Sequence, residues 1–113
     1  MTVAEWVDVA YATDIPPGHA ARVEIDGVPV AIFNCDGTFY ALDDTCSHAE
    51  ASLSEGDLDT DRCAVECPLH GSTFDLRTGD ALTLPAVEPV RAHHAEVAAD
   101  GTLRVALAEE AGA

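Results

Sequence analysis

The sequence contains no lysine, few aromatic residues and no long apolar run. Aromatic residues make up 5% of the 113 residues, and 21 Asp and Glu residues face only five basic ones, for a formal net charge of −16. Nucleic acids and anionic lipids are bound through clustered basic side chains. The composition therefore argues against nucleic acid and against a membrane surface as partners. The basic residues are all arginines: Arg22, Arg62, Arg77, Arg91 and Arg104.

The sequence also lacks the signals that direct a chain into or across a membrane. No basic segment followed by an apolar one begins the chain, and no apolar stretch approaches eighteen residues. We therefore expect a cytoplasmic protein. In that compartment cysteines are more often metal ligands or buried thiols than disulfides. Cys35 and Cys63 lie in apolar strand contexts, so we expect both to be buried thiols.

The remaining pattern is that of a small all-β protein. A length of 113 residues corresponds to one domain spanning 1–113. Apolar and polar residues alternate in short runs separated by Asp-Gly pairs, which favour tight hairpin turns. This predicts an antiparallel β-sandwich or small barrel, with at most a short helical turn within 49–58. The expected strands lie near 5–11, 21–26, 28–34, 38–42, 62–66, 73–76, 88–98 and 102–108.

Two loops interrupt the strand pattern and carry paired cysteine and histidine residues. The first, about 43–61, contains Cys46-Ser47-His48, and the second, about 67–72, contains Cys67-Pro68-Leu69-His70. Each loop can present one sulfur and one nitrogen to a common centre. Side by side, the loops would supply two thiolates and two imidazoles to a metal.

The order of these residues favours iron and sulfide over zinc. Zinc fingers with two cysteines and two histidines usually place like ligands together and carry the histidines on a helix. A [2Fe–2S] centre in which two histidines replace two cysteines on one iron suits loops of mixed type. We therefore expect Cys46 and Cys67 on one iron and His48 and His70 on the other. A small zinc-stabilised binding module remains an alternative.

The residues around these ligands resemble those of Rieske ferredoxins, which supply electrons to bacterial ring-hydroxylating oxygenases. The likeness includes the run from Cys67 to Gly79, the segment before Cys46, and a proline-bearing loop at about 84–90 that covers the cluster in the family. It implies one [2Fe–2S] cluster in a cluster-binding subdomain of two loops. It also implies a monomeric carrier between a flavoprotein ferredoxin reductase and a terminal oxygenase in aromatic hydrocarbon catabolism.

Departures from related Rieske proteins bear on the reduction potential. Respiratory and photosynthetic members carry an extra cysteine in each ligand loop, where this chain has Ala51 and Pro68, so we expect no disulfide between the loops. They also place a tyrosine hydroxyl near a ligand sulfur, where this chain has Phe74. Ser72 is expected either to donate to a cluster sulfur or to cap its own loop. Fewer hydrogen bonds to sulfur predict a potential at the low end of about −150 to +300 mV.

An electron carrier rather than an enzyme is the function that these features favour. We find no mononuclear iron triad, no nucleophile–base pair and no phosphate-binding loop. The alternative is a Rieske-type small subunit of a larger reductase, such as an assimilatory nitrite reductase. An acidic collar around the cluster could speed docking, although the acidity can also serve solubility alone. The collar would comprise Asp43, Asp44, Glu50, Glu55, Asp57, Asp59, Asp61, Glu66, Asp75 and Asp80.

Other conspicuous side chains are expected to have ordinary structural roles. His19, His93 and His94 are expected to be surface or half-buried residues. The aromatic residues expected in the core or over the cluster are Trp6, Phe33, Phe39, Tyr40 and Phe74.

Overall fold

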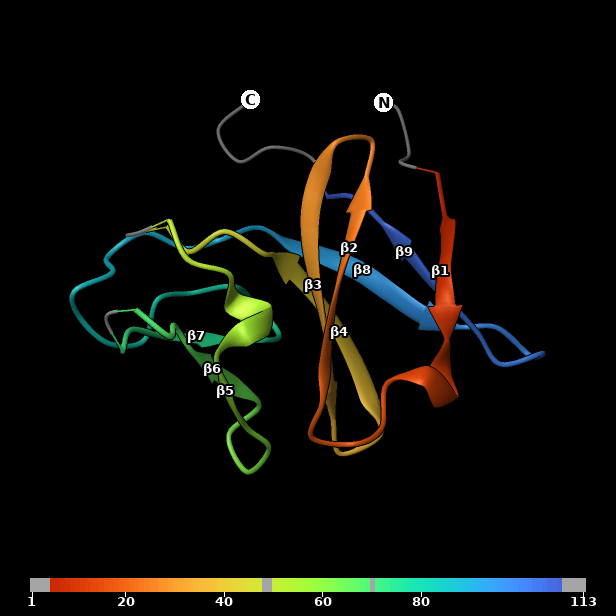
Figure 1. The fold of residues 1–113 in the computed structure, drawn as a ribbon, viewed down its shortest axis with the longest axis horizontal. Coiled ribbons are helices and arrows are strands. Elements are labelled where there is room, and N and C mark those ends of the chain that lie inside the picture. Colours follow the sequence, from red (N-terminus) through yellow and green to blue (C-terminus); the bar gives the residue numbers. More distant parts are fainter. Residues whose placement is uncertain (1–4, 48–49, 70, 109–113) are drawn as a thin grey trace.

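The larger part of the fold is a six-stranded antiparallel sheet. The structure is a computed structural model that describes residues 5–47, 50–69 and 71–108. Its larger sheet has the strand order β1-β9-β8-β4-β3-β2 (Figure 1). A short 3-10 helix, η1 (Ala12–Asp14), follows the first strand. The strands are β1 (Val7–Tyr11), β2 (Ala20–Ile25), β3 (Val28–Cys35), β4 (Thr38–Asp43), β8 (Ala92–Val97) and β9 (Thr102–Ala106).

Two Asp-Gly turns set the register of the central hairpins. Asp26-Gly27 joins β2 to β3, and Asp36-Gly37 joins β3 to β4. All four residues have positive φ, between 51° and 96°. A two-residue turn of this kind matches the twist of antiparallel strands, and Asp and Gly tolerate that conformation better than other residues. The hairpins predicted from these pairs are confirmed.

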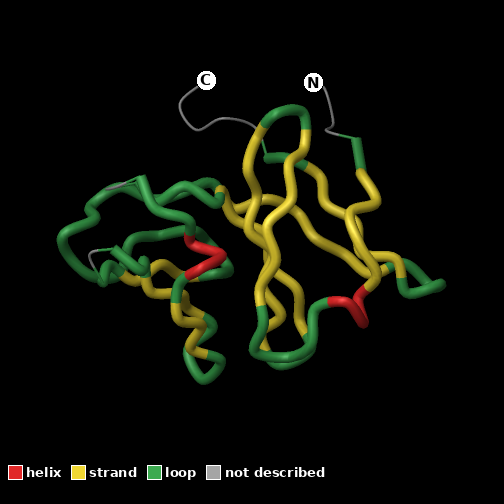
Figure 2. Tube along the Cα trace, viewed as in Figure 1, coloured by secondary structure: helices red, strands yellow, loops and turns green. Residues whose placement is uncertain are grey.

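A second, three-stranded sheet is inserted between β4 and β8. It consists of β5 (Asp57–Asp59), β6 (Ala64–Glu66) and β7 (Thr73–Asp75), and the 3-10 helix η2 (Leu53–Glu55) precedes it. The chain leaves the large sheet after Asp43 and returns to it at Ala92, where β8 begins. Figure 2 shows the loops gathered around this small sheet, at the end of the molecule away from β1.

Strand β3 is buried on both faces and connects the two sheets. Val30 and Ile32 belong to the apolar cluster of the large sheet, whereas Ala31 and Phe33 belong to a second cluster that the small sheet completes. Side chains alternate between the faces of a strand, so one apolar run can serve two cores. We call the second cluster the inter-sheet core; its buried residues are Ala31, Phe33, Cys35, Leu42, Cys46, Leu53, Val65, Cys67, Phe74, Leu76, Ala86 and Val90.

The all-β, antiparallel fold predicted from the sequence is confirmed, with local differences. The 3-10 helix η1 lies outside 49–58, the segment to which any helical turn was expected to be confined. The predicted strand 88–98 is too long, because β8 begins at Ala92 and the preceding residues belong to the proline-bearing loop. Strand β5 was not predicted; it lies where a helical turn was expected, and only η2 fulfils that expectation. Among the described residues, no helix is long and apolar enough to cross a membrane.

Candidate functional site

The loop that carries Cys46 is closed by backbone hydrogen bonds. The Cys46 amide donates to the Ala51 carbonyl over 3.0 Å, and Thr45 and Ser52 form an isolated antiparallel bridge. The ends of the loop are thereby held together just beyond β4. Cys46 is 5% exposed, so its side chain is directed into the protein rather than toward solvent.

A buried carboxylate, Asp44, fixes the base of this loop. One of its oxygens accepts from the Ser54 amide at 3.0 Å, and the other accepts from the Arg22 guanidinium at 3.2 Å. Its backbone carbonyl accepts from the Leu53 amide at 2.7 Å. Asp44 therefore joins the start of the loop to η2 and to β2. The side chain is internal, and its expected place in an acidic surface collar is wrong.

The second loop turns directly after β6. The Cys67 carbonyl accepts from the Gly71 amide over 3.0 Å, and the Cys67 amide donates to the Ser72 carbonyl over 2.7 Å. These two bonds hold Cys67 close to Gly71 and Ser72, between β6 and β7. Cys67 is 1% exposed. Like Cys46, it is presented from a closed loop to the inter-sheet core.

The proline-bearing loop is fastened to both cysteine loops. The Ser47 hydroxyl donates to the Glu88 carbonyl over 2.6 Å, and the Ala86 amide donates to the buried Ser72 hydroxyl over 3.0 Å. At the end of this loop, the Val90 carbonyl lies against Gly79. A Cβ at residue 79 would overlap that carbonyl, so only glycine allows the two segments to approach so closely. The loop thus holds the two cysteine loops together. The Ser72 hydroxyl oxygen accepts a hydrogen bond from this loop, and no bond of the hydroxyl within its own loop is seen among the described residues.

The two cysteine loops lie side by side. Cys46 and Cys67 both belong to the inter-sheet core. The expected ligands His48 and His70 lie outside the described residues. Two sulfur donors from separate loops, buried in apolar surroundings, fit the thiolate ligands of a metal centre. A hollow between the loops is lined by residues of both: Glu50, Ala51, Ser52, Glu55, Pro68 and Leu69.

Asp43, Arg91 and His93 form a group of contacts that the sequence did not predict. The group joins the two chain crossings, the places where the chain leaves β4 for the small sheet and where it comes back to β8. Asp43 accepts from the Arg91 guanidinium at 3.1 Å and lies 2.7 Å from Nε2 of His93. The Ala108 amide donates to Nδ1 of His93 over 2.9 Å, so Nε2 carries the hydrogen that is donated to Asp43. The His93 side chain is fully buried, which corrects its expected role as a surface or half-buried residue.

The charge state of Asp43 follows from these partners. Partial burial raises the pKa of the Asp43 carboxyl, but the hydrogen bonds from His93 and Arg91 and the positive charge of Arg91 lower the pKa by more. The pKa therefore lies below the ordinary value of 3.8. The Asp43 carboxylate is used inside the protein and, like Asp44, does not belong to a surface collar.

The prediction of two buried thiols at Cys35 and Cys63 is wrong, because these residues form a disulfide with Cα atoms 5.7 Å apart. Cys35 ends β3, and Cys63 precedes β6. The pair lies outside the two ligand loops. In those loops this chain has Ala51 and Pro68 where respiratory and photosynthetic Rieske proteins carry their extra cysteines. Spacing along the chain gave no sign that this turn packs against the end of β3.

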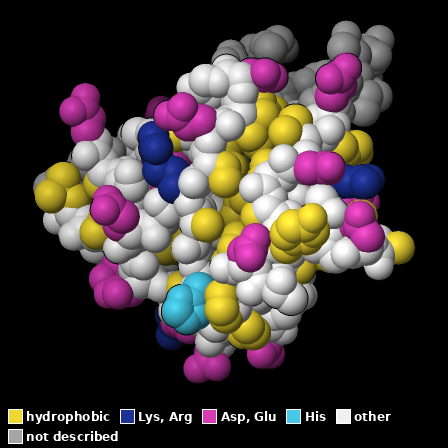
Figure 3. Space-filling view, turned by 45° about the vertical axis from the view of Figure 1, so that its right-hand side comes forward, with side chains coloured by type: hydrophobic (Ala, Val, Ile, Leu, Met, Phe, Trp, Pro, Cys, Tyr) yellow, Lys and Arg dark blue, Asp and Glu magenta, His cyan; other side chains and the backbone are white. Residues whose placement is uncertain are grey.

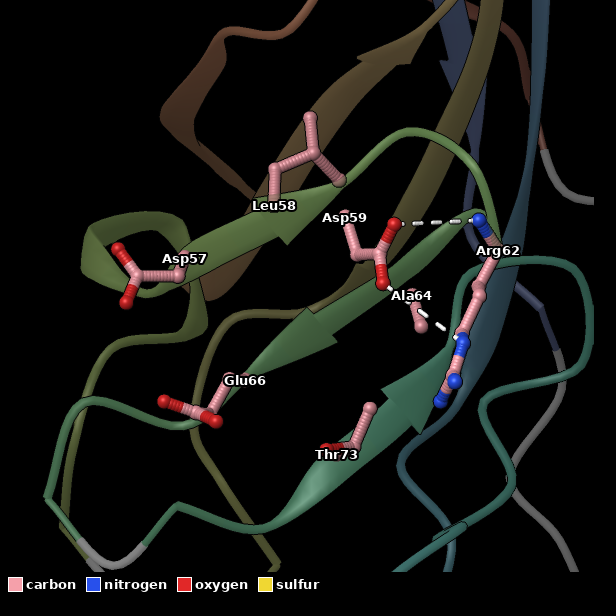
Figure 4. A pocket seen from close by; sticks show the side chains of 7 residues that line it. All are labelled: Asp57, Leu58, Asp59, Arg62, Ala64, Glu66 and Thr73. Atoms are coloured by element: carbon pink, nitrogen blue, oxygen red, sulfur yellow. Dashed lines mark hydrogen bonds and ion pairs between the residues drawn. The ribbon is translucent and has the colours of Figure 1, made fainter.

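The remaining acidic residues are distributed more widely than a collar. Figure 4 shows Asp57, Asp59 and Glu66 along one side of the small sheet, with Arg62 paired to Asp59 at 3.9 Å. Figure 3 shows Asp and Glu side chains scattered over a further face of the molecule, with apolar side chains between them. Local acidity beside the loops is therefore part of a charge that covers much of the protein.

The aromatic residues divide between core and surface. Phe33 and Phe74 are fully buried, and Phe39 and Tyr40 pack against the two cores, as expected. Trp6 is 44% exposed and lies against His94, with ring centroids 6.4 Å apart. Its expected core position is wrong.

Known proteins are similar to this chain in sequence and in fold. The model of the Rieske [2Fe–2S] domain family matches residues 5–99. The 3-phenylpropionate/cinnamic acid dioxygenase ferredoxin subunit of Photorhabdus laumondii is 45% identical over 102 residues, which cover 90% of this chain and 94% of that protein.

Solved structures agree with this relationship. The ferredoxin of carbazole 1,9a-dioxygenase from Nocardioides aromaticivorans IC177 matches with a TM-score of 0.87 and 37% identity, covering 91% of this chain and 98% of that one. A chain in a complex of oxygenase and ferredoxin of carbazole 1,9a-dioxygenase matches with a TM-score of 0.84 and 40% identity, covering 93% and 97%. A structure assigned to a nitrite reductase small subunit from Mycobacterium tuberculosis matches with a TM-score of 0.85 and 27% identity, covering 96% and 100%. The chain belongs to the Rieske [2Fe–2S] domain family.

Proposed function

We propose that Cys46 and Cys67 bind one iron of a [2Fe–2S] cluster and that His48 and His70 bind the other. Two buried sulfur side chains, each on its own closed loop in one apolar core, carry this proposal. Each histidine follows its cysteine by two or three residues, so each loop can supply one ligand to each iron.

The function that follows is one-electron transfer from a flavoprotein reductase to a terminal oxygenase that hydroxylates aromatic rings. When bound, a cluster with two histidine ligands accepts one electron at a higher potential than an all-cysteine cluster. The chain buries the sulfur ligands, and its proline-bearing loop ties the two ligand loops together. Its relatives are named as ferredoxin subunits of dioxygenases, so this chain is an electron-transfer component rather than a catalytic subunit.

Iron and sulfide analysis of single variants tests the ligand assignment. Replacing Cys46 or Cys67 with Ser, or His48 or His70 with Ala, is expected to remove or alter the visible spectrum. The matched control is His19→Ala, which removes an exposed imidazole just before β2 and should leave the spectrum unchanged. An unaltered spectrum in either ligand-histidine variant would contradict the assignment.

Partners dock at the end of the molecule that carries the ligand loops. Large apolar side chains are normally buried, and exposed groups of them mark interaction surfaces. Four such side chains, one in the second ligand loop and three in or just before the proline-bearing loop, are between 52% and 76% exposed. We call them the tip residues: Leu69, Leu82, Leu84 and Val87.

Electron transfer kinetics with a purified flavoprotein reductase and a terminal oxygenase test this face. Replacing Leu84 and Val87 with Ser is expected to slow both transfers by weakening complex formation while leaving the reduction potential unchanged. Val97→Ser, at an exposed apolar residue of β8, is the control and should transfer electrons normally. Equal effects of the tip and control substitutions would contradict docking at the tip.

A mobile carrier is favoured over a fixed subunit of a larger reductase. The match to the dioxygenase ferredoxin subunit is 45% identical, against 27% for the structure assigned to a nitrite reductase small subunit. Rapid reduction of the isolated protein by a flavoprotein reductase, followed by its reoxidation by a separate oxygenase, is expected for a carrier. Activity only in a permanent complex would favour the subunit.

We further propose a monomer of one domain, residues 1–113, that acts in the cytoplasm. The inter-sheet core joins the small sheet to the large one, which supports a single folding unit. Light scattering is expected to give the mass of one chain, and unfolding should follow a single cooperative transition. A dimer, or two separate transitions, would contradict these proposals.

A further inference from the structure

The Cys35–Cys63 disulfide joins the two sheets at a place that no backbone pairing serves among the described residues. Cys35 is the last residue of β3 in the large sheet, and Cys63 lies in the turn between β5 and β6 of the small sheet. Figure 1 shows this turn at the far tip of the small sheet. The bond is therefore a covalent link between the part of the protein that forms the scaffold and the part that carries the ligand loops.

The bond lies at the opposite end of the β3–β4 ladder from the chain crossings. In this ladder Cys35 pairs with Thr38, whereas Asp43 pairs with Val30, five residues before Cys35 in β3. At the Asp43 end, the small sheet is held by the bonds of Asp43 with Arg91 and His93. The disulfide is the corresponding fastening at the other end, so opening it would leave the small sheet covalently joined only at the crossings.

Both cysteine loops are connected to this bond, along the chain and through the inter-sheet core. The disulfide closes a chain segment with a sequence separation of 28, and that segment contains Cys46. On its other side, Cys63 is followed directly by β6, which ends one residue before Cys67. Cys35 itself is buried in the inter-sheet core together with Cys46 and Cys67. A change at this bond can therefore reach both loops through one strand and one shared core.

The turn at Cys63 needs support from outside itself. Cys63 has φ of 50°, in the left-handed region that residues with a Cβ rarely adopt. Besides the disulfide, the turn is held by the Leu76 amide, which donates to the Cys63 carbonyl over 2.9 Å. Within the turn, the Asp59 carboxylate also accepts from the Asp61 and Arg62 amides. Loss of the disulfide would remove the covalent bond between this turn and β3, so we expect the turn and the start of β6 to relax.

Access to the bond is one-sided. Cys35 is 2% exposed, whereas Cys63 is half-buried and follows the exposed residues Asp61 and Arg62. An attacking thiolate can reach Cys63 from solvent, and thiol–disulfide exchange requires such access. Disulfides of cytoplasmic proteins are mostly transient or redox-sensing, so in the proposed location this bond would meet dithiols able to open it.

We propose that Cys35–Cys63 is a site of thiol–disulfide exchange that controls how firmly the protein retains its cluster. A dithiol attacks Cys63 Sγ, releasing Cys35 as a thiol and forming a mixed disulfide. The second thiol of the reagent then attacks the reagent sulfur that is bonded to Cys63, which releases Cys63 as a thiol. Two electrons and two protons pass to the protein, and the dithiol becomes a cyclic disulfide. The effect on the cluster rests on the proposed ligation by the two loops.

The test compares the full-length protein with its cluster before and after treatment with dithiothreitol. Mass spectrometry of the denatured chain should show a gain of two hydrogens on treatment. The visible absorbance should then decay several-fold faster, and the thermal midpoint should fall by about 10 °C. The double variant C35A/C63A should resemble the treated protein and should not respond to dithiothreitol, which controls for reaction of the reagent with the cluster.

Several outcomes would overturn the proposal. These are free thiols at Cys35 and Cys63 in the untreated protein, unchanged cluster retention after the bond is opened, or an equal response of the double variant to the dithiol. If the double variant does not fold, the treated natural chain carries the test, with Cys63→Ala as a second variant. Failure of the ligand assignment is separately visible, because His48 and His70 variants would then keep their spectra while the mass and thermal shifts remained.

Discussion

Single side chains at the chain crossings determine how the small sheet is attached to the large one. Asp43 receives hydrogen bonds from Arg91 and His93, and His93 in turn accepts from the Ala108 amide. The residues come from the end of β4, the start of β8 and the segment after β9. This group therefore ties the entry and exit of the inserted segment to the C-terminal end of the large sheet.

Replacing Asp43 with Asn is expected to destabilise the protein by about 1–3 kcal/mol at pH 7, because hydrogen bonds to a charged acceptor are lost. The folded pKa of Asp43 lies below the ordinary value of 3.8. A carboxylate with a lowered pKa stabilises the folded state above its unfolded pKa, and this contribution is lost as the pH falls through the folded value. The difference in unfolding free energy between wild type and variant should stay constant from pH 7 to pH 5 and narrow only below about pH 4.

Chemical denaturation across this pH range provides the measurement. Asp26→Asn, in an exposed turn where Asn is well tolerated, is the control and should track the wild type throughout. A difference between wild type and the Asp43 variant that narrows already above pH 5 would contradict this account of the Asp43 carboxylate.

At the residue scale, the sequence could predict features whose residues are close together in the chain, but not contacts between residues far apart in it. The cysteine–histidine pairs could be found because each pair lies within four residues. The partners of Cys35 and His93 could not, because Cys63 and Asp43 are far away along the chain and meet them only through the packing of the two sheets. The alternation of side chains along a strand placed His93 on one face of the sheet, but it did not show which residues cover that face.

At the scale of elements, turn chemistry was a better guide than strand composition. The Asp-Gly pairs located the β2–β3 and β3–β4 hairpins, because few other residues accept positive φ at both positions. Strand β5 was missed because Asp57-Leu58-Asp59 is short and acidic, and it pairs only through tertiary context. The strand expected at 88–98 ran on into the proline-bearing loop, whose shape depends on its bonds to the ligand loops.

The small sheet contains a like-charge pair with a measurable consequence. Asp57 lies directly opposite Glu66 in the β5–β6 register, and like charges in this position are destabilising. Glu66→Gln is therefore expected to stabilise the protein by about 0.2–1 kcal/mol. Denaturant unfolding at low salt, where the repulsion is strongest, provides the measurement.

A matched substitution in the large sheet should have the opposite sign. Glu96 lies opposite Arg104 in the β8–β9 register, so Glu96→Gln removes an attractive pair and should be neutral or slightly destabilising. If both glutamates gave the same change in unfolding free energy, the cross-strand interpretation would be untenable and net charge alone would explain the result.

At the scale of the whole molecule, the net charge of −16 governs how the protein meets its partners. Association with a reductase of opposite charge is expected to slow as salt is added, because ions screen the attraction. Stopped-flow reduction at increasing ionic strength provides the measurement, and a rate that does not vary with salt would exclude electrostatic steering.

Paired charge variants separate local docking from general acidity. D57N/E66Q removes two carboxylates from the small sheet, and D26N/E96Q removes two from exposed positions of the large sheet. If local acidity beside the ligand loops steers docking, the first pair should lower the rate at low salt more than the second. Equal effects would mean that steering comes from the net charge of the whole protein. The wide distribution of acidic residues over the surface agrees with that alternative.

The most direct test of the central claim is a redox titration of the purified protein followed by electron paramagnetic resonance. The account predicts a single one-electron transition in the lower part of the range of about −150 to +300 mV. It also predicts nitrogen couplings in the reduced signal that change when His48 or His70 is replaced. A protein that holds zinc, or an iron centre whose signal shows no nitrogen coupling, would contradict it.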